Sequence, residues 1–92
     1  MHYLRARLNR PREKQPVAGD FFILAESDLD AGAVAHDICR ERSWEFSAYL
    51  ALAQVVGRSD IEGEPEHIRA FEIAQSAGYA VVISELLPGE DE

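Results

Sequence analysis

The sequence has few of the features that cross-link a small protein, direct its export or anchor it in a membrane. Its 92 residues include one cysteine, Cys39, which excludes an intrachain disulfide and a zinc site built on paired cysteines. No run approaches the roughly 18 apolar residues of a membrane helix. The polar, basic start of the chain lacks the apolar segment of a signal peptide. These absences predict a cytoplasmic protein that does not contact a membrane.

Signatures of common catalytic and cofactor sites are also missing. There is no glycine-rich phosphate loop, no dinucleotide fingerprint and no serine nucleophile elbow. The three histidines, His2, His36 and His67, stand in separate segments, so no local metal-ligand spacing is visible. The sequence therefore predicts no metal and no cofactor. It leaves open whether the protein is an enzyme and favours a protein that is not.

Positive charge is scarce and unevenly placed. Seventeen acidic and nine basic residues give a net charge of −8. Residues 1–15 hold five of the bases and one acid, whereas residues 16–92 hold four bases and sixteen acids. An acidic body repels phosphate backbones, which argues against nucleic acid as a partner. Arg5 and Arg7 are candidates for binding an external anion, or they form exposed ion pairs with the protein's own acids.

Composition indicates one small globular domain over residues 1–92. Hydrophobic residues make up 47% of the chain and charged residues 28%, which is ordinary for a folded domain. Residues 1–19 are predicted to form a basic N-terminal strand and loop, and residues 88–92 an acidic frayed tail.

Hydrophobic periodicity predicts the order β-β-α-β-α-β. Residues 3–10 alternate apolar and polar, which indicates a strand with one buried face, and residues 21–25 form the apolar run of a buried strand. A capped helix follows, whose apolar stripe is Ala31, Val34, Ala35, Ile38 and Cys39.

The second half of the chain ends in a helix and a strand. Pro65 is suited to the first turn of that helix and Gly78 to its end, and residues 79–86 are typical of a strand. The segment from Trp44 to Val56 is ambiguous. As a strand it places Phe46 and Tyr49 on opposite faces; as a helix it would give a three-helix, three-stranded α+β fold. We take the strand.

This order predicts a two-layer α/β sandwich, an α+β fold of ferredoxin-like type. Two helices are expected on one face of a four- to five-stranded sheet, which leaves the other face open. An open, partly apolar face is a large surface for so small a domain to leave in water. The sequence therefore predicts a homodimer formed through the sheet.

Two groups of side chains are candidates for ligand binding. The acids Glu26, Asp28 and Asp30 stand between a strand and a helix, where α/β folds place ligands, although helix capping accounts for the same residues. His67 lies one turn into the second helix, where the helix dipole keeps an imidazole neutral and able to accept a proton. The alternative for His67 is a structural histidine.

The sequence thus favours a small acidic, non-enzymatic protein-interaction or regulatory module that associates with itself. An acidic inhibitor of a basic protein is a special case, because opposite charge speeds such an encounter. The alternative is a small enzyme or a ligand- or metal-binding domain with its site near His67 and Asp28.

Overall fold

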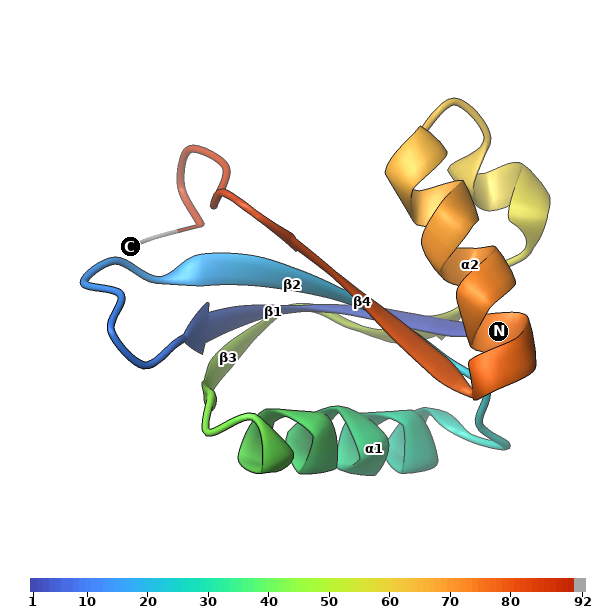
Figure 1. Cartoon of the computed structure of the whole chain (residues 1–92). Helices are drawn as coiled ribbons and strands as arrows, with labels where there is room; N and C mark the ends of the chain where they lie inside the picture. Colours follow the sequence, from blue (N-terminus) through green and yellow to red (C-terminus); the bar gives the residue numbers. More distant parts are fainter. Residues whose placement is uncertain (91–92) are drawn as a thin grey trace.

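A computed structural model describes residues 1–90 and shows a four-stranded antiparallel sheet with two α-helices (Figure 1). The elements in chain order are β1 (His2–Asn9), β2 (Val17–Ile23), α1 (Asp28–Glu41), β3 (Glu45–Val55), the 3-10 helix η1 (Arg58–Ile61), α2 (Pro65–Ala77) and β4 (Tyr79–Ser84). The predicted α+β class is confirmed. The ferredoxin-like arrangement is not confirmed, because the strands lie in the order β3-β1-β2-β4.

The two helices cover opposite faces of the sheet, so the prediction that both lie on one face is wrong (Figure 1). α1 packs on the face that holds Leu4, Leu8 and Phe21. α2 packs on the other face, against Phe22 and Ala80. The reason lies in β2, where neighbouring phenylalanines alternate between the faces and make both of them apolar. Both faces are therefore apolar, and a helix packs on each of them. The open face that was expected to support a homodimer is absent from the described residues.

β3 confirms the strand prediction for the ambiguous segment but corrects its faces. Leu8 pairs with Phe46 and Ala6 pairs with Tyr49, so β3 advances three residues where β1 advances two. This extra residue is a β-bulge, and it returns Tyr49 to the face of Phe46. Their ring centroids lie 4.9 Å apart. Tyr49 and Phe46 therefore share the α1 side of the sheet.

α1 begins and packs as its sequence predicts. The Ser27 Oγ accepts a hydrogen bond from the Asp30 amide at 3.1 Å, which caps the helix. The buried residues of its apolar stripe are Ala31, Ala35, Ile38 and Cys39. Gly32 lets the helix approach β3, since a Cβ at that position would lie 2.8 Å from the Tyr49 hydroxyl oxygen. The small side chains of α1 thus bring it close to the β3 edge.

α2 is bounded by the residues that the sequence indicates. Pro65 occupies its first turn, and Gly78 ends it with a left-handed φ of 95°. No helix within residues 1–90 is long and apolar enough to cross a membrane.

Candidate functional site

A buried carboxylate organises the α2 side of the sheet. Asp20 lies on the central strand β2, and its side chain is only 3% exposed. Its carboxylate accepts hydrogen bonds from the Tyr3 hydroxyl at 2.6 Å and from Arg5 Nη1 at 3.0 Å. Arg5 stands directly opposite Asp20 in the β1–β2 register. Burying a carboxylate away from water costs free energy unless such partners compensate it. The folded chain therefore depends on the pairing of Asp20 with Arg5.

His67 brings α2 into the same cluster. Its Nε2 lies 3.3 Å from Asp20 Oδ2, and its Nδ1 lies 3.2 Å from Glu64 Oε2. A neutral imidazole has one N–H and donates to one of these carboxylates, whereas the protonated ring donates to both. The ring is also held by Phe22, whose centroid lies 5.3 Å away. His67 is therefore fixed between two carboxylates.

Arg5 links the cluster to the C-terminal segment. Its Nε and Nη2 donate to the Glu90 carboxylate at 2.9 and 2.7 Å, a two-point contact. The hydrogen bond from Arg5 holds the pKa of Glu90 below its ordinary value, and the bond to Glu90 raises the pKa of Arg5. Burial, followed by the hydrogen bond to Asp20, raises the pKa of Tyr3. Because Arg5 is only 13% exposed, the expectation of exposed ion pairs is wrong for this residue.

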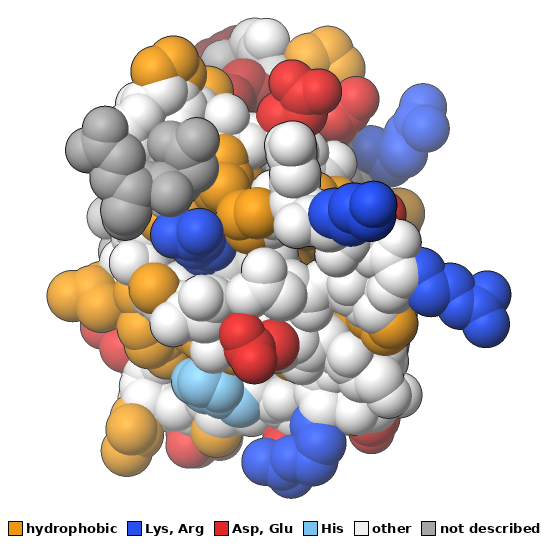
Figure 2. Space-filling view, turned by 90° about the vertical axis from the view of Figure 1, so that its left-hand side faces the viewer, with side chains coloured by type: hydrophobic (Ala, Val, Ile, Leu, Met, Phe, Trp, Pro, Cys, Tyr) orange, Lys and Arg blue, Asp and Glu red, His pale blue; other side chains and the backbone are white. Residues whose placement is uncertain are grey.

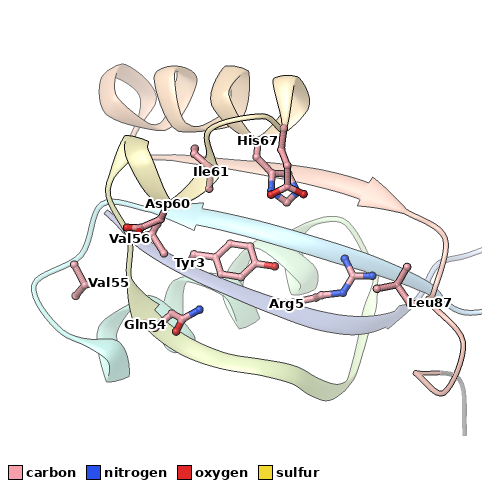
Figure 3. A pocket seen from close by; sticks show the side chains of 10 residues that line it. Tyr3, Arg5, Gln54, Val55, Val56, Asp60, Ile61, His67 and Leu87 are labelled. Carbon is pink, nitrogen blue, oxygen red and sulfur yellow. The ribbon is translucent and has the colours of Figure 1, made fainter.

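A cavity of about 400 Å³ opens beside this cluster (Figure 3). Tyr3, Arg5 and His67 line it together with residues from the end of β3, from η1 and from the C-terminal segment. The polar groups of Tyr3, Arg5 and His67 already contact Asp20, Glu64 and Glu90. No serine or cysteine lines the cavity within the described part of the chain. The arrangement therefore stabilises a buried charge.

The structure brings together only part of the predicted ligand-binding set. His67 and Arg5 meet at Asp20. Arg7 lies further along β1, beside a separate cavity of about 660 Å³ that Glu13 and Glu85 also line. Glu26, Asp28 and Asp30 stand at the start of α1, where Asp28 lies 3.3 Å from His2 Nε2.

His67 and Asp28 do not form one site, because the sheet separates them. His2, the contact of Asp28, and Tyr3, a neighbour of His67, are consecutive on β1 and point to opposite faces. Among residues 1–90, no three histidine, cysteine or acidic side chains are grouped as a metal ion would require. The key residue that sequence reasoning missed is Asp20. Its signal is a single acid beside an apolar run.

An apolar groove of about 580 Å³ lies between α1 and β3. Its lining includes Leu29, Gly32 and Ala33 from α1, and Tyr49 and Leu52 from β3. Leu29 is 84% exposed and Leu52 is 73% exposed. Water thus meets large apolar side chains on both walls. We call this surface, with the outer edge of β3, the α1–β3 groove.

The β3 edge beside this groove carries few charges. Residues 46–57 contain no charged side chain, in a protein whose net charge is −8. β3 is the end strand of the described sheet, so the backbone groups on its outer side have no strand partner within residues 1–90. Sequence reasoning did not identify this edge, because the exposure of Leu52 depends on the position of β3 in the sheet.

No family model, no curated protein and no solved structure matches the chain. Its function is therefore inferred from the arrangement of its side chains. On the face seen in Figure 2, the lysine and arginine side chains stand apart from one another among acidic, apolar and polar groups. Such spacing does not make the continuous basic patch that a nucleic-acid backbone requires.

Proposed function

We propose that the protein is a small, non-enzymatic interaction module that binds an extended protein segment at the α1–β3 groove. One observation carries the proposal: the longest strand of the sheet, 11 residues, lies at its edge with exposed Leu52 beside an apolar groove. An added strand satisfies the free backbone groups of such an edge, and its alternate side chains enter the neighbouring groove.

The energetics favour binding at this place. Complete burial of a leucine side chain contributes about 1.5–3 kcal/mol, so Leu29 and Leu52 offer two anchors that are mostly exposed in the free chain. Gly32 and Ala33 keep the wall of α1 low, which leaves room for the side chains of the incoming segment. The backbone of β3 supplies register, and the groove supplies selectivity for apolar side chains.

An enzyme or ligand-binding domain with a site near His67 and Asp28 has less support. The two residues lie on opposite faces of the sheet, and the polar groups around His67 are bonded to one another. The α1–β3 groove, in contrast, presents large apolar side chains that the rest of the protein leaves exposed to water.

Selection from a library of random dodecapeptides displayed on phage tests the proposal. We expect the wild-type protein to enrich peptides with alternating apolar residues. These peptides should bind Leu52→Lys about tenfold more weakly, because the charge enters the groove. Ile73→Lys is the matched control, since Ile73 is 48% exposed on α2. Enriched peptides that bind Leu52→Lys as well as they bind wild type would refute a function for the groove.

A further inference from the structure

We infer that the segment bound at the α1–β3 groove is β3 of a second copy of this chain. This inference rests on the proposed function, since it names the occupant of the same edge. The two β3 strands pair antiparallel about a twofold axis normal to the sheet, and the two four-stranded sheets become one.

Charge is the first argument. Two chains of net charge −8 repel each other, and the described surface carries acids on α1, η1 and α2. β3 carries one acid, Glu45, at its first position. Antiparallel pairing places the two Glu45 side chains at opposite ends of the interface. Like charges directly opposite each other destabilise a strand pair, and this pairing has none.

The distribution of side chains between the two faces is the second argument. Tyr49 and Leu52 line the groove on the α1 side of β3, whereas Ala48 and Ala51 pair with Arg7 and Arg5 of β1 on the α2 side. A twofold axis normal to the sheet brings the large apolar side chains of both copies together on the α1 side.

The other edge of the sheet lacks these properties. β4 has 6 residues against the 11 of β3, and short edge strands are one way in which proteins prevent pairing between sheets. β3 carries neither lysine nor proline, two residues that block an edge, although three register shifts against β1 make its pairing irregular. Length therefore favours β3 over β4 as the edge for a second copy.

The helices add to the same interface. A twofold axis normal to the sheet keeps both α1 helices on one side of the joined sheet. Leu29, at the start of α1, and Leu52, on the opposite wall of the groove, then face the second copy across the axis. Two grooves that are open in the separate chains close against each other.

Sedimentation equilibrium of the full chain, from micromolar to several hundred micromolar, tests this inference. We expect a dimer whose dissociation constant rises about tenfold or more in Leu52→Lys and is unchanged in Ile73→Lys. Leu29→Lys is a second variant that should also weaken the dimer, and Leu29 is so exposed on α1 that its replacement leaves the fold intact. Circular dichroism confirms folding of each variant.

A cross-link tests the geometry. Leu50→Cys, at the middle of β3, should form a disulfide between copies under mild oxidation, whereas Ile73→Cys should not. A wild-type chain that stays monomeric throughout overturns self-association; if the groove-dependent peptides still bind, the proposed function stands without it. A dimer that resists both lysine substitutions and shows no Leu50→Cys cross-link overturns the β3 interface.

Discussion

Replacement of Arg5 by glutamine tests how the buried charge of Asp20 is stabilised. The substitution removes the positive charge from a pair whose side chains are 13% and 3% exposed, with Nη1 of Arg5 3.0 Å from Asp20 Oδ2. Breaking a buried pair costs about 3–5 kcal/mol. Tyr3 still donates to Asp20, His67 Nε2 still lies 3.3 Å from its carboxylate, and Arg5 is partly exposed, so we expect a loss of about 2–3 kcal/mol in the free energy of unfolding.

Arg7→Gln is the matched control, because it removes the same charge from the same face of β1 without an Asp20 contact. Urea unfolding followed by the fluorescence of Trp44 measures both variants. Arg7→Gln should cost less than about 1 kcal/mol, in the range of ordinary surface substitutions. Thermal unfolding should show a midpoint lower by roughly 10–20 °C for Arg5→Gln, given the size of the domain.

Salt separates a buried pair from an exposed one. The Debye length falls to about 3 Å at 1 M salt, which screens exposed charges but acts weakly on a pair shielded from water. The deficit of Arg5→Gln should therefore persist in concentrated sodium chloride. Equal unfolding midpoints for the two variants, or a deficit that disappears in salt, would show that Asp20 does not depend on Arg5.

Three further predictions follow from the core and the C-terminal segment. Gly19→Ala should destabilise the protein by about 1–3 kcal/mol in urea unfolding, because its Cβ would lie 2.7 Å from the buried Leu8 Cδ1; an unchanged midpoint would contradict this contact. The pKa of Glu90 is lowered by Arg5, so the contact contributes stability above the ordinary pKa of a glutamate and loses it as the pH falls through the lower folded value. After correction for the intrinsic pH dependence of exchange, the protection of the amides of residues 87–90 should fall over that acid range in wild type, and a Glu90→Gln variant that keeps the same pH dependence would refute the assignment. Burial raises the pKa of the Cys39 thiol, so a disulfide reagent should modify the native protein only as fast as it opens, whereas immediate modification would place the thiol at the surface.

The sequence predicted the α-helices and most of the strands, but it placed residues 17–19, the start of β2, in a loop, and it did not predict how the elements are arranged. Local signals such as the Ser27 cap, Pro65 and Gly78 correctly predicted both helices, and the aromatic residues of β3 correctly predicted a strand. The faces covered by the helices depend on which strands are neighbours. Alternation along a single strand does not contain that information, although the adjacent phenylalanines of β2 are consistent with two apolar faces.

The site shows the same division. Arg5 was identified from its charge, and His67 was identified from its position on a helix. Their common partner, Asp20, is 15 residues from Arg5 and 47 from His67 along the chain, so only the folded topology brings the three together. The shift of Tyr49 to the face of Phe46 arises from a β-bulge in β3, which strict alternation does not predict.

Hydrogen–deuterium exchange of the β3 amides at increasing protein concentration tests most directly whether this edge is the interaction surface. Amides on the outer side of β3 should exchange rapidly in dilute solution and become protected as the concentration rises, while those of β4 keep their rates. In Leu52→Lys, the β3 amides should stay unprotected at every concentration. Exchange rates of β3 that do not change with concentration, or protection that appears at β4 instead, would show that the β3 edge does not bind a second copy.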